Sequence, residues 1–256
     1  MGGLLRVPLI ELVYIKTNQA GIAPERIIAM RSRVIKAIEE NKLIVICRGI
    51  PAHMLIPTGE ALYRGGVRLL EITYSPDGRV SDEETAETIR LLAKHFEGLM
   101  DVGAGTVLTK QQVQLTAEAG GKFIISPDAV PEIIAESKRL GLVSIPGALT
   151  PSEITAAHRA GADFVKLFPA GAMGLPYFKA VKAPLSHIRL LAVGGIEADA
   201  AGAYLEAGAA GFGLSSSILK KTLLDRKDYS GITEAARKYV TVIEKSSQFA
   251  AGTQKK

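Results

Sequence analysis

The chain has 256 residues, 47% of them hydrophobic and 22% charged, a composition that excludes collagen-like, low-complexity and disulfide-rich proteins. Its single cysteine, Cys47, can form neither an internal disulfide nor a cysteine-based zinc or iron–sulfur site, so we expect a reducing, cytoplasmic location. The net charge of +5 is scattered along the chain and aromatic residues make up only 5%, which favours a small anionic ligand over nucleic acid.

The two ends of the chain differ from its middle. The segment MGGLLRVPLIELVYI is apolar but interrupted by charged residues and a proline, and a membrane span needs about 20 apolar residues, so no membrane insertion is expected. We interpret residues 1–23 as an N-terminal arm and residues 24–40 as a helix that closes the bottom of the fold, with Pro24 in its first turn. Residues 246–256 are expected to form a polar, disordered tail.

Between these ends, eight short apolar runs alternate with helical stretches at a mean spacing of about 24 residues, which suits one strand and one helix per repeat. The runs begin near Leu43, Arg68, Met100, Lys122, Val143, Asp163, Leu190 and Ala210. Eight such repeats predict a single-domain α/β protein, a (β/α)8 TIM barrel over residues 24–245. The alternative, a doubly wound open sheet, requires a glycine-rich dinucleotide turn, and GAGTVL has Leu108 where the third glycine belongs.

Three of the predicted helices begin with a capping box, in which a Ser or Thr is followed three residues later by Glu or Gln. The pairs are Ser81 with Glu84, Thr109 with Gln112, and Thr150 with Glu153. Each falls where the repeat requires a helix to start, which supports the predicted order of elements.

Two ionisable residues fall inside the predicted strands. Glu71 shares a strand face with Leu69, and Lys166 shares one with Phe164 and Phe168. Apolar surroundings lower the pKa of a lysine, and a neutral amine can attack a ketone to form a Schiff base, while a nearby carboxylate can move protons. We predict Lys166 and Glu71 as catalytic residues; the alternatives are a structural ion pair and a lysine that reaches outward to solvent.

Glycine turns follow the seventh and eighth predicted strands. AVGGIEAD contains Gly194 and Gly195, and GFGLSSS contains Gly213, Ser215 and Ser216. Free backbone amides and a helix dipole bind phosphate at such turns, and barrels often place a phosphate site after strands seven and eight. The pair of turns predicts a phosphate site, although either turn alone is equally typical of an ordinary tight loop.

Other motifs narrow the chemistry. GAGTVL follows the third strand and brings the Thr106 hydroxyl to the expected position of a substrate carboxylate. The four histidines have no metal-ligand spacing such as HxH or HExxH, so no metal site is predicted.

In chain order, the segments LIVICRGI, LEITYSP, VGAGTVL, FIISPD, SIPGALTPSE, FVKLFPAGAMGLPYFKAVKAP, LAVGGI and GFGLSSS resemble the 2-keto-3-deoxy-6-phosphogluconate (KDPG) and 4-hydroxy-2-oxoglutarate (KHG) aldolases. The resemblance spans residues 30–245, and CRGI is particularly similar to the 2-keto-3-deoxy-6-phosphogalactonate branch. It implies a metal-free class I aldolase on a (β/α)8 barrel, usually a homotrimer. No cofactor is implied beyond a covalent imine with Lys166, the family's Schiff-base lysine, and Glu71 matches its proton-shuttling glutamate.

The resemblance also assigns residues that bind the substrate. It implies that Thr106 and Pro127 line a pyruvate pocket, and that Gly194, Gly195 and the turn from Gly213 to Ser216 hold a phosphate.

The sequence departs from the family in three places. Ser75 stands where the gluconate branch has a carboxylate-binding arginine, and Arg48 is the expected substitute because its guanidinium can hold a carboxylate bidentately. The second loop, SPDGRVSDEE, is longer, so Asp77 or Arg79 is expected near the mouth of the barrel. Ser215 replaces a common glycine, which leaves the phosphorylation of the substrate open, although a serine hydroxyl can donate to phosphate.

Residues and resemblance together predict a lyase of carbohydrate metabolism of the Entner–Doudoroff kind. The predicted reaction is reversible cleavage of a 2-keto-3-deoxy-6-phospho sugar acid, of the gluconate or galactonate type, to pyruvate and glyceraldehyde 3-phosphate. Three alternatives stay open: an aldolase for a non-phosphorylated 2-keto acid such as 4-hydroxy-2-oxoglutarate, a phosphosugar isomerase or epimerase, and a silent phosphosugar-binding protein. An isomerase would need a second acid or base facing Glu71 and would not need Lys166.

Overall fold

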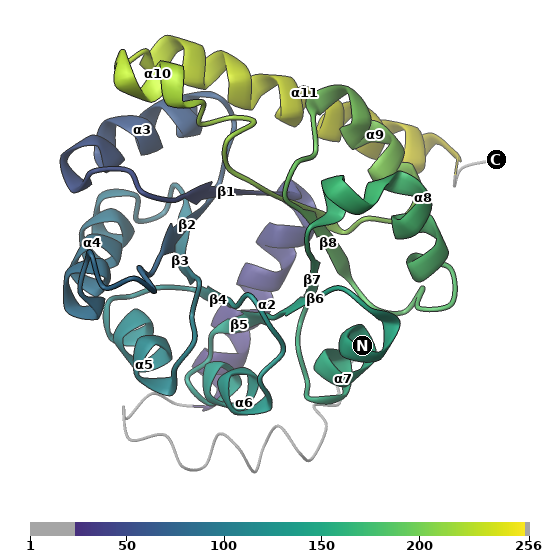
Figure 1. Cartoon of the computed structure of the whole chain (residues 1–256), viewed down its shortest axis with the longest axis horizontal. Helices are drawn as coiled ribbons and strands as arrows, with labels where there is room; N and C mark the ends of the chain where they lie inside the picture. The colour runs from purple at the N-terminus through teal and green to yellow at the C-terminus, as the bar shows by residue number, and fades with distance from the viewer. Residues whose placement is uncertain (1–23, 254–256) are drawn as a thin grey trace, which may run out of the picture.

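The computed structural model describes residues 24–253; the arm predicted over residues 1–23 lies outside this range, as do residues 254–256. Parallel strands form a ring that helices surround (Figure 1). The strands are β1 (Leu43–Cys47), β2 (Leu69–Thr73), β3 (Asp101–Gly105), β4 (Phe123–Ile125), β5 (Val143–Ile145), β6 (Gly147–Ala148), β7 (Val165–Leu167), β8 (Leu190–Val193) and β9 (Gly211–Leu214). The helices are α2 (Pro24–Asn41), α3 (Ala52–Arg64), α4 (Asp82–His95), α5 (Lys110–Glu118), α6 (Pro131–Arg139), α7 (Pro151–Arg159), α8 (Ala170–Lys182), α9 (Ala198–Glu206), α10 (Lys221–Asp225) and α11 (Tyr229–Thr253). None of the helices found between residues 24 and 253 has the length and apolar character needed to cross a membrane.

The ring closes through the predicted fifth strand, which is split in two. Neighbouring strands follow the order β5-β4-β3-β2-β1-β9-β8-β7-β6, all parallel. β5 pairs with β4 and β6 pairs with β7, and the break between them falls at Pro146, which has no N–H to donate to a ladder. The Lys166 amide donates to the Pro146 carbonyl at 2.8 Å across the break. The predicted (β/α)8 barrel is therefore confirmed, with one of its eight strand positions divided.

The predicted helix starts are found in the structure, whereas the start of one strand and the end of the last helix differ from the prediction. All three predicted capping boxes form, at Ser81, Thr109 and Thr150. β7 begins at Val165 rather than near Asp163, because the amides of Asp163 and Phe164 both donate to the Ser144 carbonyl, at 3.0 and 3.3 Å, while the Asp163 carboxylate accepts from the Ser144 amide at 2.9 Å. α11 continues to Thr253, so the boundary expected at residue 245 falls inside a helix, and the disordered tail expected from residue 246 is wrong over residues 246–253.

Helix α2 closes the end of the barrel at which the strands begin, as predicted. It crosses behind the ring of strands in Figure 1. Its residues Val34 and Ile38 are almost fully buried and belong to the apolar cluster that fills the barrel interior with residues such as Leu69 and Phe164. Burying each of these two side chains stabilises the fold by about 1.5–3 kcal/mol.

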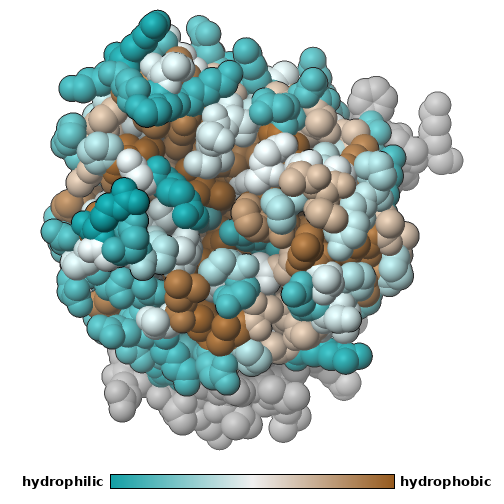
Figure 2. All heavy atoms as spheres, viewed as in Figure 1, coloured by the Kyte–Doolittle hydropathy of each residue, from teal (hydrophilic) through white to brown (hydrophobic). Residues whose placement is uncertain are grey.

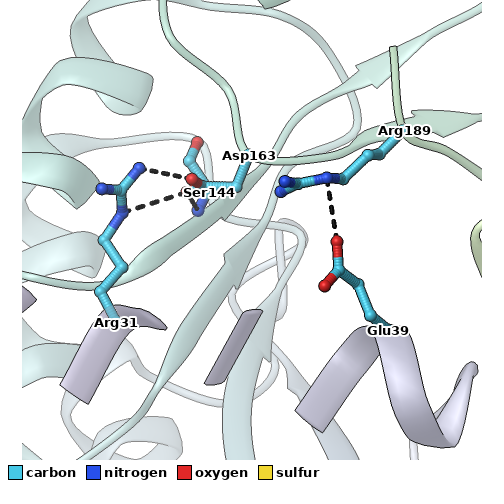
Figure 3. A network of polar contacts seen from close by, with 5 residues as sticks. All are labelled: Arg31, Glu39, Ser144, Asp163 and Arg189. Carbon is cyan, nitrogen blue, oxygen red and sulfur yellow. Dashed lines mark hydrogen bonds and ion pairs between the residues drawn. The ribbon is translucent and has the colours of Figure 1, made fainter. Parts of the chain in front are cut away.

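Ion pairs also fasten α2 to the strand ends. Arg31 pairs with Asp163 just before β7, and Glu39 pairs with Arg189 just before β8 at 3.0 Å (Figure 3). The first pair is largely buried, with side chains 16% and 6% exposed, whereas the second is 46% and 44% exposed. Buried charges are expensive to leave unpaired and exposed pairs contribute little, so the Asp163 pair should hold α2 more strongly.

This difference predicts unequal effects of two matched substitutions. Asp163→Asn should lower the free energy of unfolding by about 2 kcal/mol, because Arg31 loses its carboxylate partner in a partly buried site. Glu39→Gln should lower it by at most about 0.5 kcal/mol. Urea denaturation with an unchanged m-value is the measurement, and equal losses for both variants would contradict the role given to Asp163.

Candidate active site

Two charged side chains are buried on the strands of the described chain: Glu71 on β2, 1% exposed, and Lys166 on β7, 8% exposed. Their neighbours two residues earlier, Leu69 and Phe164, belong to the cluster inside the barrel. Because side chains alternate along a strand, Glu71 and Lys166 point into the same interior, one layer nearer the open end. The predicted placement of both residues is confirmed.

Burial changes the protonation of both groups. Removal from water raises the pKa of Glu71 to about 7, against smaller opposing effects of the positive charges of Lys166 and Arg48. Removal from water also lowers the pKa of Lys166, and Arg48 lowers it further, while the Glu71 carboxylate raises it. Burial is the largest cause in both cases, so the amine of Lys166 loses its proton more readily than a lysine in water does, and the carboxyl of Glu71 exchanges its proton near neutral pH.

A glycine makes room for the Glu71 carboxyl. A Cβ at Gly105 would lie 1.6 Å from Oε1 of Glu71, so any larger residue would displace the carboxyl. The other oxygen, Oε2, is buried and has no hydrogen-bond partner among the described residues. An unpartnered buried carboxyl oxygen is costly to the fold and available to a ligand or a transferred proton. The sequence did not indicate the role of Gly105, because the pairing of β2 with β3 is needed to bring it beside Glu71.

Arg48 and Thr106 meet at the open end. Nη2 of Arg48 donates to Oγ1 of Thr106 at 3.0 Å. Thr106 has a φ of 56°, a left-handed conformation that is strained for a β-branched residue and that is typical of functional loops. The guanidinium of Arg48 also acts electrostatically on Glu71 and Lys166, so it lies close enough to orient an anion beside them.

Pro127 lies next to the lysine strand. A Cβ on Gly147 would come within 2.2 Å of the Pro127 carbonyl oxygen, and Gly147 is the register partner of Lys166. Phe168 differs from the prediction, since it is 46% exposed rather than enclosing the lysine, and its ring centre lies 4.9 Å from Nζ.

The two glycine turns lie side by side after β8 and β9. The Gly194 amide donates to the Gly213 carbonyl at 3.3 Å and ties them together. The amides of Gly195, Ser215 and Ser216 donate to no acceptor within residues 24–253, which leaves three donors for an anion.

Ser215 differs from the prediction. Its hydroxyl donates to the Ile46 carbonyl at 2.8 Å, so the proton expected for a phosphate is already used to join the turn to β1. Its backbone amide is the donor that remains.

The long second loop does reach the mouth. Arg48, Ser75, Asp77 and Arg79 line a cavity of about 490 Å3 there, on the face seen in Figure 2. Asp77 accepts hydrogen bonds from the Ser75 hydroxyl and from Arg79, which lower its pKa to about 2. Its carboxylate is therefore ionised, and both of its oxygens accept hydrogen bonds from residues of its own loop.

The thiol of Cys47 lies close enough to Glu71 to be affected by its charge. Burial and, to a smaller extent, the charge of Glu71 raise the pKa of Cys47 to about 12, so this residue is a thiol rather than a nucleophile at neutral pH. Among the residues that the structure describes, no three His, Cys, Asp or Glu side chains gather as a metal site.

Comparison with known proteins identifies relatives of the whole barrel. The family model for KDPG and KHG aldolase matches residues 34–235. The probable 2-dehydro-3-deoxy-6-phosphogalactonate aldolase of Rhizobium meliloti (strain 1021) is 35% identical over 182 residues, which cover 71% of this chain and 83% of that protein.

Solved structures of aldolases also superpose on this chain. The native KDPGal structure superposes with a TM-score of 0.72 at 30% identity and covers 80% of this chain and 96% of that one. The KDPG aldolase of Legionella pneumophila, with pyruvate captured at low pH as a covalent carbinolamine intermediate, superposes with a TM-score of 0.68 at 27% identity, covering 79% and 96%.

The electrostatics of the site predict an unusual titration. In the free protein, the carboxyl of Glu71 should gain its proton with a midpoint near pH 7, and Lys166→Met should raise that midpoint because the lysine's charge lowers it. Infrared difference spectra can follow the carboxyl band, with Glu71→Gln identifying it. Glu136, whose pKa is lowered by Arg139, serves as the internal control that is ionised throughout. A Glu71 midpoint near 4.5 would contradict the burial argument.

Proposed function

Because the chain belongs to the family of KDPG and KHG aldolases, we propose that it reversibly cleaves a 2-keto-3-deoxy-6-phospho sugar acid to pyruvate and glyceraldehyde 3-phosphate. The enzyme is a lyase of the aldolase class, which releases pyruvate and an aldehyde. The observation that carries the residue assignment is the burial of Lys166 and Glu71 together inside the barrel. An isomerase would need a second acid or base beside Glu71 and would not need Lys166. Apart from these two, the strands of the described chain bury no charged residue.

Lys166 is the proposed nucleophile. Its neutral amine attacks the C2 ketone of the substrate to give a carbinolamine, which takes up a proton and loses water to form a positively charged imine. The lowered pKa of Lys166 raises the fraction of amine available for this attack. The carbinolamine captured in the Legionella enzyme is the same kind of intermediate, which supports this step.

Glu71 is the proposed proton carrier. Its carboxylate, acting through water, accepts the C4 hydroxyl proton as the C3–C4 bond breaks, and the electron pair of that bond moves into the imine. This releases the aldehyde and leaves an enamine, which takes up a proton at C3. Water then hydrolyses the imine, which releases pyruvate and restores the amine. A carboxyl with a pKa of about 7 can both accept and return a proton at neutral pH.

The remaining site residues are proposed to bind the substrate. Arg48 and Thr106 hold the carboxylate, and Pro127 forms a wall of the pyruvate pocket. The turn of Gly194 and Gly195, with the turn from Gly213 to Ser216, holds the phosphate through free amides. We also propose a homotrimer in the cytoplasm, acting in a pathway of the Entner–Doudoroff kind. The family resemblance supports the assembly and the pathway, and the single cysteine supports the compartment.

A second substrate class has one observation in its favour. Because the Ser215 hydroxyl is bonded to the Ile46 carbonyl, it is not available as a donor to a phosphate. A non-phosphorylated 2-keto acid such as 4-hydroxy-2-oxoglutarate would not need that missing donor.

Covalent trapping tests the mechanism. Borohydride added with pyruvate should attach a reduced pyruvyl group to one lysine per chain, and peptide mass spectrometry should locate it at Lys166. Lys166→Met should remove the label and reduce turnover to background. Lys182 is the matched control, because burial lowers its pKa too, while its Nζ donates to the Ser186 and Ile188 carbonyls. A label on Lys182, or none on the wild-type chain, would refute the assignment.

Coupled pyruvate release tests the substrate class. Across the gluconate and galactonate epimers, we expect kcat/KM to be at least about tenfold higher with the 6-phosphate than without it, since three backbone amides bind the dianion. Arg48→Ala should raise KM for both forms alike, because it acts on the shared carboxylate. Equal kcat/KM with and without phosphate would favour the non-phosphorylated class.

A further inference from the structure

A second cavity lies at the closed end of the barrel, away from the mouth. Its volume is about 740 Å3, within the range of sites that hold small metabolites. It is bounded by α2, by the C-terminal part of α4, and by the chain just before β2, β3 and β4. Five cationic side chains line it: Arg33, Arg68, Arg90, Lys94 and Lys122.

The lining has a clear excess of positive charge. Two carboxylates, Glu97 and Asp101, also line the cavity, and Arg90 is paired with Glu87 outside the lining, so the cations around the cavity exceed the carboxylates by two. Asp101 is already neutralised by Arg33, whose guanidinium donates to both of its oxygens, at 2.6 and 3.0 Å. Cations from separate elements around one concave site raise the local concentration of anions.

Arg68 is fixed in place with one edge free. Its Nη1 donates to the carbonyls of Tyr63 and Val67, at 3.1 and 2.7 Å, and its guanidinium lies 4.3 Å from the centre of the Tyr63 ring. Nε and Nη2 have no hydrogen-bond partner within residues 24–253. That is the edge with which arginine binds a phosphate through two parallel hydrogen bonds.

Two lysines add unpaired charge. The ammonium groups of Lys94 and Lys122 form no ion pair or hydrogen bond with the rest of the described chain. Lys94 lies in the last turn of α4, where the interaction of its charge with the helix dipole is enough to explain a cation. That reason does not apply to Arg68 and Lys122, which directly precede strands.

We propose that this cavity is a second anion-binding site, for a small molecule that carries adjacent phosphate groups. The free edge of Arg68 would bind one phosphate, and Lys94 and Lys122 would neutralise the next. The site is separate from the predicted phosphate turns, which lie after β8 and β9 at the other end of the strands. The proposal does not rest on the aldolase function, and occupancy would add contacts between α2, through Arg33, and the barrel.

Inorganic pyrophosphate is the probe. Calorimetric titration of the full chain at fixed ionic strength should show binding, and hydrogen exchange should show protection at residues 97–102 and 120–122, separately from any at 194–196 and 213–217. The double variant Lys94→Ala/Lys122→Ala should bind at least about tenfold more weakly at the closed end. Its kcat for pyruvate release, and any protection at the mouth, should not change.

A matched control removes two exposed lysines elsewhere, Lys179→Ala/Lys245→Ala, on α8 and α11. It should bind pyrophosphate like the wild type and show the same ligand-induced rise in Tm, a rise that should be smaller in the test variant. Three results would overturn the proposal: equal binding by the test variant, an equal loss in the control, or protection at the mouth alone.

Discussion

The site depends on keeping one amine and one carboxyl out of water inside a barrel that is otherwise apolar. Water would stabilise the charged forms of both groups, and the amine would then be a poor nucleophile at neutral pH. The apolar layer beneath them and the helix that covers it keep that side of the barrel dry. The closed end therefore contributes to the shifted pKa values of Glu71 and Lys166 at the open end.

The same burial has a cost that the rest of the fold offsets. A carboxyl oxygen without a partner and a lysine among apolar side chains each lower stability. The compensation is found in two places: in the side chains that α2 inserts into the interior, and in the ion pairs that hold this helix against the strand ends. The two buried ionisable side chains thus lie toward the end of the barrel at which the strands finish, and the contacts of α2 that stabilise the fold lie at the end at which they start.

Local patterns in the sequence predicted most of the fold. The spacing of apolar runs, the alternation that turned Glu71 and Lys166 inward, and the three capping boxes all depend on residues close together in the chain. What the sequence could not indicate depends on pairing between distant segments. The bond from Ser215 to Ile46 joins residues 169 positions apart, and the carboxylate of Asp163 leaves the strand for partners on other elements. How the barrel closes around the break at Pro146 also depends on such pairing, since β5 pairs with β4 and β6 pairs with β7.

The close approach of Gly105 to Glu71 means that the residue allowed at one position depends on the residue present at the other. With glutamate at 71 in this conformation, only glycine fits at 105, so random substitution at 105 alone removes the carboxyl from its place without altering it chemically. A descendant that lost the glutamate would be released from this restriction. The residue found at 105 in a distant homologue is therefore a record of whether that lineage still holds a carboxyl at this point in its barrel.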